Sequence, residues 1–460
     1  MLSNLATRDV ETLIHPYTNL ALFRETGPLV LDRGHGVWVY DTDGRPYLEG
    51  MAGLWCTALG YSNEELVEAA REQMARLPFT HLFSGRSHDP AIELAEILKE
   101  LAPIPVSKVF FTSSGSEAND TQVKLTWYLN NALGRPRKKK IISHVKGYHG
   151  VTVASASLTG LPANHADWDL PLPGFLHARC PHHYRGAEPG ESEEAFSARL
   201  AAELDALIQR EDPDTVAAFI AEPVLGAGGA IVPPTGYFEA IGRVLAAYDI
   251  RFVADEVICG FGRLGTWFGA ETMGMRPASL SFAKAITSAY MPLGGLTVEE
   301  PLYQAMLDES RKIGTFGHGT TYSGHPVACA VAIKALEIYR RDRLVEAASE
   351  KAPHFQRRLS ALAEHPLVGE ARGIGLIGGL EIVADKATKR QYDPKAGVAA
   401  RCVAFAQAEG LIVRFLAGDR VAVCPPLVIT PDEIDALFDR LARALDRTAE
   451  WIRQENLTAV

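Results

Sequence analysis

The middle of this 460-residue chain alternates short β-rich runs with helix-like stretches, and this alternation restricts its fold more than any other feature. The β-rich runs lie at 109–111, 141–143, 217–220 and 251–254, and the clearest helical patterns at 193–209 and 237–248. Strands and helices that alternate in this way build a parallel sheet through crossover connections. The sequence therefore predicts an α/β fold, whose ligands bind beyond the carboxyl ends of the strands.

The chain is also long enough to need two domains, since single cores stop growing at roughly 250 to 300 residues. We expect a large domain at 61–325 and a smaller α+β domain at 326–460. The latter begins with an amphipathic stretch at 326–362, continues with strands around 379–383 and 420–423, and ends in a helix from Pro431. Residues 1–60 carry a hairpin pattern with a turn at 41–44, which we expect to join the smaller domain.

Composition argues against several classes of binding partner and against several cellular locations. The 46 Lys and Arg against 56 Asp and Glu give a formal charge of -10, which disfavours binding to nucleic acid or to an anionic membrane. The six scattered cysteines suit a reducing cytoplasm, and residues 1–16 lack the pattern of a signal peptide. Residues 216–234, the longest nearly uncharged stretch, contain Glu222, prolines and glycines, unlike a membrane helix.

Small hydroxyl residues and a glycine follow the strand at 108–112, in the sequence Ser113-Ser114-Gly115-Ser116 before a helix. Free amides at a helix N-terminus, with hydroxyls beside them, can hold a phosphate, although a plain capping turn uses the same residue types. Tyr148 follows the strand at 140–144 and exposes an aromatic ring at the same sheet edge, where it could stack on a planar ligand or simply pack.

A carboxylate and a lysine end two further strands. Asp255 follows the run 251–254, and a buried acid at the tip of a central strand needs a cation or a protonated ring as its partner. Lys284 follows the run 280–283, where a buried amine can act as a nucleophile, although most lysines extend to the surface instead. The phosphate cradle, aromatic ring, carboxylate and lysine together match the requirements of pyridoxal 5'-phosphate.

The same segments resemble those of class III pyridoxal-phosphate aminotransferases of fold type I, most closely the branch that uses an amine or ω-amino acid and pyruvate. The similarity extends from Tyr17 to the closing helix. The matching segments are 113–120, 147–150, 221–224, 255–263, 283–288 and 318–326. The resemblance implies a large, mostly parallel seven-stranded sheet and a smaller α+β lobe built from both termini.

The resemblance also implies roles for individual residues. Lys284 would form the Schiff base and then shuttle the proton, and Asp255 would hold the pyridine nitrogen protonated. The other implied cofactor-binding residues are Ser114, Gly115, Ser116, Tyr148, His149, Glu222, Val257 and Thr321. Thr321 would reach the phosphate across the interface of a homodimer. The sequence leaves open whether dimers pair further into a tetramer.

Substrate binding is implied by the same branch. Arg414 would pair with the substrate carboxylate, because a planar guanidinium fork matches a carboxylate, while a surface arginine on a small-lobe strand is the alternative. Tyr17, Trp55, Phe83 and Ala227 would line the pocket, and core packing explains any one of the aromatic residues equally well. The substrates would be a small-molecule amine donor and a keto acid acceptor.

We therefore predict a homodimeric aminotransferase that transfers an amino group to a keto acid, expected to be pyruvate, and yields alanine. The alternatives are a 2-oxoglutarate-dependent class III aminotransferase, a glutamate-1-semialdehyde-type aminomutase, a related decarboxylase and a non-enzymatic binding protein. The last of these would be expected to lack Lys284 or Asp255. We expect no metal site, because Cys180-Pro181-His182-His183 has no second ligand pair at zinc spacing.

Overall fold

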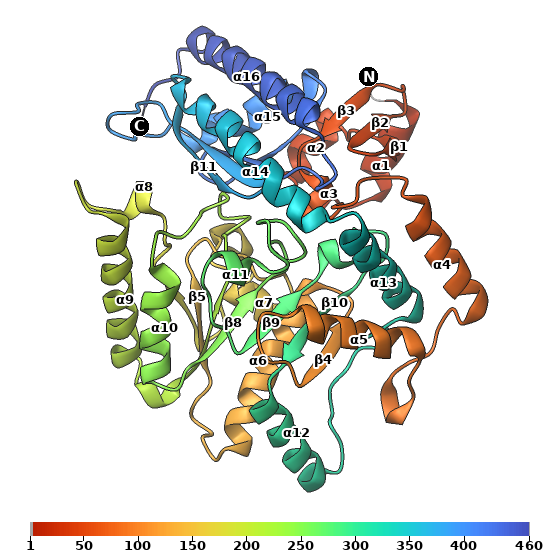
Figure 1. The fold of residues 1–460 in the computed structure, drawn as a ribbon. Coiled ribbons are helices and arrows are strands. Elements are labelled where there is room, and N and C mark those ends of the chain that lie inside the picture. Colours follow the sequence, from red (N-terminus) through yellow and green to blue (C-terminus); the bar gives the residue numbers. More distant parts are fainter. Residues whose placement is uncertain (1–2, 460) are drawn as a thin grey trace.

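The computed structural model describes residues 3–459, and a seven-stranded sheet forms the centre of the large domain (Figure 1). The strand β10 runs antiparallel to both of its neighbours, and the other neighbouring strands are parallel to one another. In sheet order the strands are β4 (Lys108–Thr112), β10 (Gly294–Val298), β9 (Ser279–Phe282), β8 (Arg251–Asp255), β7 (Val216–Ala221), β5 (Lys140–His144) and β6 (Phe175–Ala178). The predicted mostly parallel sheet is confirmed.

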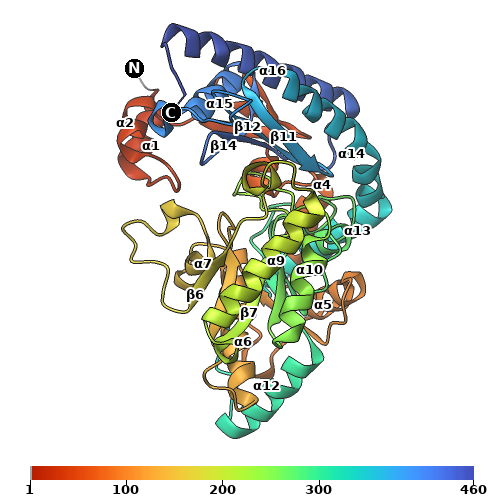
Figure 2. The ribbon, with the colours of Figure 1, turned by 90° about the vertical axis from the view of Figure 1, so that its left-hand side faces the viewer.

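Both faces of this sheet are covered by helices, which explains why every residue of β7, β8 and β9 is buried. Alternate residues of a strand point to opposite faces. Phe219 of β7 belongs to one buried cluster with residues of α9 (Glu193–Arg210) and α10 (Tyr237–Ala247). Ile220 belongs to another with residues of α6 (Gly115–Ala132) and α7 (Val153–Leu158). The sheet is thus the middle layer of a three-layer domain (Figure 2).

The smaller lobe contains strands from both ends of the chain, as expected. One four-stranded sheet joins β1 (Leu31–His35), β2 (Trp38–Asp41) and β3 (Pro46–Glu49) to β13 (Leu411–Ile412), which pairs parallel to β3. The other has the order β11 (Val368–Ile374), β12 (Ile377–Ile382), β15 (Arg420–Val423) and β14 (Arg414–Leu416). The helices α15 (Val398–Ala408) and α16 (Pro431–Gln454) pack together in this lobe.

The amphipathic stretch at 326–362 forms two helices, α13 (Pro326–Arg341) and α14 (Leu344–Ala361), separated at Arg343, whose φ is 50°. The helix α13 packs against α4 (Glu64–Arg76) and α5 (Asp89–Leu101), whereas α14 packs against α16 and β11. The stretch therefore crosses from one part of the molecule to the other. The boundary at 325/326 itself stays a prediction.

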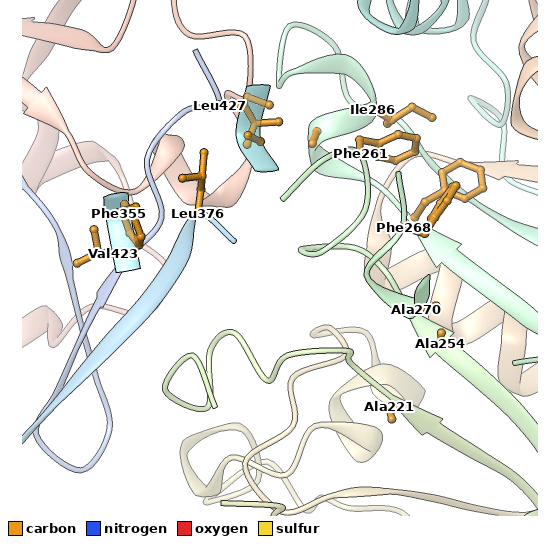
Figure 3. Close-up of a cluster of buried hydrophobic side chains, with 14 of the residues drawn as sticks. Ala221, Ala254, Phe261, Phe268, Ala270, Ile286, Phe355, Leu376, Val423 and Leu427 are labelled. Atoms are coloured by element: carbon orange, nitrogen blue, oxygen red, sulfur yellow. The ribbon is translucent and has the colours of Figure 1, made fainter. Parts of the chain in front are cut away.

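A continuous apolar core connects the two lobes. One buried cluster contains Ala221 and Ala254 at the central sheet as well as Phe355 and Val423 of the smaller lobe (Figure 3). The remaining α-helices are α1 (Asn4–Thr12), α2 (Leu20–Thr26), α3 (Ala52–Trp55), α8 (His183–Gly186), α11 (Gly269–Thr272) and α12 (Glu300–Ile313). Among residues 3–459, no helix has the length and apolarity to cross a bilayer.

Candidate active site

The ends of neighbouring strands meet at a cavity of about 350 Å³. Asp255 ends β8, Glu222 follows β7, and Lys284 comes two residues after β9. Nine of the ten predicted cofactor residues line this cavity: Ser114, Gly115, Ser116, Tyr148, His149, Glu222, Asp255, Val257 and Lys284. The edge of the sheet at which the sequence predicts ligand binding is thus a pocket in the structure.

Asp255 is only 3% exposed, and three N–H groups hold its carboxylate. Oδ2 accepts hydrogen bonds from Asn119 Nδ2 at 2.7 Å and from His149 Nδ1 at 2.8 Å, and Oδ1 accepts one from the Val257 amide at 3.1 Å. With Asp255 as its acceptor, His149 carries its hydrogen on Nδ1. These contacts fix the orientation of a carboxylate that borders the cavity.

The N-terminus of α6 also lines the cavity. The Ser114 hydroxyl caps the helix by accepting from the Glu117 amide at 3.2 Å, while the next amides, of Gly115 and Ser116, have no partner within the helix. A Cβ atom at Gly115 would lie 2.9 Å from a methyl of Val257. Glycine therefore allows the helix terminus and Val257 to approach the same ligand.

Lys284 enters the pocket from a strained backbone. It begins a short 3-10 turn, Lys284–Thr287, with a φ of 54°, a conformation that residues other than glycine adopt rarely and at some cost. Its Nζ lies 5.8 Å from the ring centroid of Trp55. The turn after β9 thus places an amine between the cofactor pocket and Trp55.

Glu222 connects the cofactor pocket with the loop that follows it. Its Oε1 accepts from the Tyr148 amide at 2.9 Å, and its Oε2 accepts from the Gly226 amide at 2.9 Å. Burial outweighs these bonds and the nearby His149, and raises the pKa of Glu222 to about 7. Burial also raises the pKa of the Tyr148 phenol. Burial therefore disfavours the charged form of both groups.

Four of the five predicted substrate residues lie near this pocket. The Arg414 guanidinium carbon lies 5.3 Å from the Trp55 ring centroid, and Tyr17 packs edge-on to Tyr148 at 6.4 Å between centroids. Ala227 packs against the buried cluster that contains Trp55. The N-terminal segment, the loop after β7 and strand β14 thus converge on one region.

Phe83 and Thr321 lie elsewhere in the single chain. Phe83 is 42% exposed, and its ring contacts Gly319, where a Cβ atom would come within 2.6 Å of it. Thr321 is exposed two residues farther along. The expectation that Phe83 lines the pocket is not met within one chain, because its segment packs against 318–324 instead of the strand ends.

Sequence reasoning missed Asn119 and Cys56, which both line the cavity. Asn119 donates to Asp255 and, at 2.7 Å, also to the His149 carbonyl. The signal was present, since Asn119 follows Gly115 by one helical turn and so shares its face of α6. Cys56 offered no comparable signal, because it is brought here only by the packing of the N-terminal segment.

These residues suit pyridoxal 5'-phosphate, which supplies an electron-accepting ring when it is bound. The helix N-terminus offers amides to a phosphate, Asp255 offers a held carboxylate to a ring nitrogen, and Lys284 offers an amine to an aldehyde. Asn119 Oδ1 is a buried acceptor without a partner among the described residues, which marks this side of the cavity as polar. The site is that of a pyridoxal-phosphate-dependent enzyme.

The comparison with family models gives the same class over most of the chain. Residues 23–445 match the model "Aminotransferase class-III", and the chain belongs to this family. "Gamma aminobutyrate transaminase 1, mitochondrial" of Solanum lycopersicum is 48% identical over 96% of this chain and 86% of its own length. The protein of the same description from Oryza sativa subsp. japonica is 49% identical with the same coverage.

Solved structures agree with this assignment. The ω-transaminase from Pseudomonas jessenii in complex with PMP has a TM-score of 0.96 and 53% identity, and the match covers 98% of this chain and 99% of that one. A transaminase obtained by ancestral reconstruction has a TM-score of 0.95 at 46% identity, over 97% and 99% of the two chains. The fold and cofactor class therefore rest on sequence, geometry and comparison together.

Proposed function

We propose that this transaminase transfers an amino group from an amine or ω-amino acid to pyruvate, and so forms alanine. The observation that carries the proposal is the position of Arg414, which faces the same Trp55 ring as the Lys284 amine. A keto acid whose carboxylate pairs with Arg414 would then place its carbonyl carbon on the lysine side.

Arg414 has the properties of a receptor for an anion. Burial lowers its pKa, and the ionisable neighbours that act on it are Tyr148 and Tyr17, with no carboxylate among them. A half-buried guanidinium without an acid partner gains most from an incoming carboxylate, which can accept two parallel hydrogen bonds. An amine donor without a carboxylate would not use this contact.

The comparisons support this range of donors. The similar structures are of ω-transaminases and the curated relatives are gamma-aminobutyrate transaminases. In a variant of a thermostable ω-transaminase engineered for enantiopure bulky amines, a tryptophan, a phenylalanine and an arginine are replaced. Trp55, Phe83 and Arg414 have the same residue types at the same spacings along this chain. We propose that they line the substrate pocket here, together with Tyr17 and Ala227.

Pyruvate suits the charges at the site better than 2-oxoglutarate does, because the latter carries a second carboxylate. Lys284 is the one cation among the residues that line the cavity. Arg263, buried nearby, already donates to the carbonyls of Leu376 and Pro425 at 3.0 and 2.6 Å. Arg414 is therefore the available partner, and it satisfies one carboxylate.

The roles of the residues follow from their positions. Lys284 would release the cofactor aldehyde to the donor and then carry a proton from the donor carbon, since its amine is the base that lines the cavity at that side. Asp255, held by Asn119 and His149, would keep the ring nitrogen protonated. Tyr148 would cover one face of the ring and Val257 the other.

We also propose that the enzyme is a homodimer in the cytoplasm. The exposed apolar residues Phe79, Phe83, Ile313 and Tyr322 flank the segment that carries Thr321. A second copy would cover them and bring Thr321 to a phosphate and Phe83 to a substrate pocket. The six cysteines are unpaired, which suits a reducing compartment.

The test is the half-reaction of the purified protein loaded with cofactor. An amine such as 1-phenylethylamine should bleach the visible band of the bound cofactor, and pyruvate should restore it with release of alanine. Restoration by 2-oxoglutarate alone would assign the enzyme to the other acceptor class. Conversion of glutamate-1-semialdehyde without an added acceptor would instead make it an aminomutase. Replacing Arg414 should weaken the binding of pyruvate. It should leave the bleaching of the cofactor band by the amine intact.

A further inference from the structure

A buried cluster of ion pairs connects the large domain to the smaller lobe. Glu381 of β12 is fully buried, and its side chain accepts from Arg372 of β11, Arg420 of β15 and Arg185 of α8 at 3.2, 3.1 and 2.5 Å. Burial opposes ionisation, yet Arg420 and Arg372 hold the pKa of Glu381 at about 2. The cluster is therefore charged and stays paired at neutral pH.

His182, Glu370 and Glu381 also lie close enough together to resemble a metal site. Their oxygens are already used, however, because Arg372 donates to Glu370 Oε2 at 2.5 Å and His182 contacts the same oxygen at 2.8 Å. A cation would have to displace arginines that neutralise the acids. The geometry fits a structural network better than a metal centre.

Arg372 extends this network into the loop after β7. Its Nε and Nη2 both donate to the carbonyl of Gly229, at 3.0 and 2.6 Å. Gly229 has a φ of 130°, and a Cβ atom there would lie 2.8 Å from Arg372 Nη2 and 2.5 Å from Arg420 Cδ. Because Glu222 holds the Gly226 amide, the short loop that contains Ala227 is fixed at both ends.

Arg420 extends the network in the other direction, to the strand that carries Arg414. Strands β14 and β15 are an antiparallel pair in which Arg414 opposes Ala422 and Leu416 opposes Arg420. Arg420 also donates to the Ala417 carbonyl in the turn between them. Glu381 thus connects Arg372, which holds the Ala227 loop, with Arg420, which holds the β14–β15 hairpin that carries Arg414.

We propose that Arg372 is a positioning residue, which sets the distance between the Ala227 loop and the β14–β15 hairpin and so tunes selectivity for the size of the donor. Ala227 packs against the cluster that contains Trp55 and also Leu416 and Ala422 of that hairpin, so the two elements border the same space. The inference rests on the proposed function, since it takes this space to be the donor pocket.

The experiment compares two donors that differ by one methylene, 1-phenylethylamine and 1-phenylpropylamine, in single-turnover half-reactions of the cofactor-loaded enzyme. In Arg372→Ala the loop is freed, and the ratio of kcat/KM should move toward the larger amine by ~10-fold, the range that one methylene commands in a fitted pocket. Arg372→Lys, which retains the charge but offers a single donor group, should give an intermediate ratio. Gly229→Ala, which disturbs the same contact from the loop, should move the ratio in the same direction.

Arg185→Ala is the matched control, because Arg185 also pairs with Glu381 but does not contact the Ala227 loop. It should lower the melting temperature and leave the ratio unchanged. An unchanged ratio in Arg372→Ala, or an equal shift in Arg185→Ala, would overturn the inference. If Arg372→Ala does not fold, the ratio of kcat/KM in Arg372→Lys and in Gly229→Ala tests the inference in the same way. A wild-type enzyme that reacts neither with these amines nor with an ω-amino acid such as 4-aminobutyrate would refute the proposed function instead.

Discussion

The cofactor pocket and the substrate walls are constructed differently. The pocket residues follow the strands of one sheet, and bonds such as those from Asn119 and His149 to Asp255 hold them in place. The proposed substrate walls come from separate segments, with Trp55 near the N-terminus and Arg414 in the smaller lobe. The difference teaches that the chemistry is fixed by one domain, whereas selectivity depends on how several segments meet. Changes in the two regions should therefore have separable effects.

Removing the reactive amine should have the largest effect. Lys284→Ala should lower turnover by about four orders of magnitude or more, because it removes the amine that we propose binds the aldehyde and moves the proton. Steady-state alanine formation measures the rate, and the absorbance of bound cofactor shows that the pocket is still formed. A residual rate within tenfold of wild type would contradict the assigned role.

Removing the carboxylate receptor should affect the acceptor and spare the donor. Arg414→Ala loses a charge-assisted bidentate contact, which corresponds to a rise of ~10 to 100-fold in KM for pyruvate. The bleaching step with an amine that lacks a carboxylate should stay within about threefold of wild type, as measured by stopped-flow absorbance. Equal losses in both half-reactions would show that cofactor and substrate regions are not separable in this way.

A smaller effect is expected from the support of Asp255. Asn119→Ala removes one of three donors to the carboxylate, and kcat should fall by roughly tenfold, the value of one hydrogen bond to a charged group. Its signature is a loss in kcat with little change in KM for pyruvate, since the substrate walls are untouched. A change confined to KM would place Asn119 among the substrate residues.

The smallest effect concerns Glu256, which follows Asp255 but points to the other side of the strand end. It accepts from the amides of Gly269 and Ala270, and burial outweighs these bonds and raises its pKa to about 8, from a usual 4.5. The folded state therefore holds a proton that the unfolded state releases, so stability should fall as pH rises through this window. The Glu256→Gln variant should not show this pH-dependent loss of stability.

Melting temperatures at pH 5 and pH 8 measure this difference. Between the two conditions, wild type should lose roughly 2 °C more than Glu256→Gln does. Parallel declines would mean that Glu256 is ionised at both pH values. Lys284→Ala serves as the control, because it alters the cofactor pocket and leaves the Glu256 contacts in place.

Much of the sheet and of the cofactor pocket could be predicted because both depend on local sequence. The runs at 217–220 and 252–254 are apolar along their whole length, which marks strands buried on both faces, and the polar residues that follow them mark the ligand edge. Lys284 and Asp255 could be identified for this reason. The strand β10 runs antiparallel, which its short Gly-rich sequence did not indicate.

The features that could not be predicted depend on contacts between distant segments. Arg343 adopts a left-handed conformation that divides one amphipathic stretch into two helices, although arginine is a good helix former. Phe83 packs on Gly319, and the bonds from Arg372 to Gly229 join positions more than a hundred residues apart. No local pattern encodes such pairings.

The most direct test of the central claim is a single titration of the cofactor-loaded protein, followed by its visible absorbance. The account predicts that 1-phenylethylamine or 4-aminobutyrate bleaches the band, that pyruvate restores it, and that alanine appears in equal amount. A protein with Lys284 intact that shows no bound-cofactor band when cofactor is supplied would contradict the account.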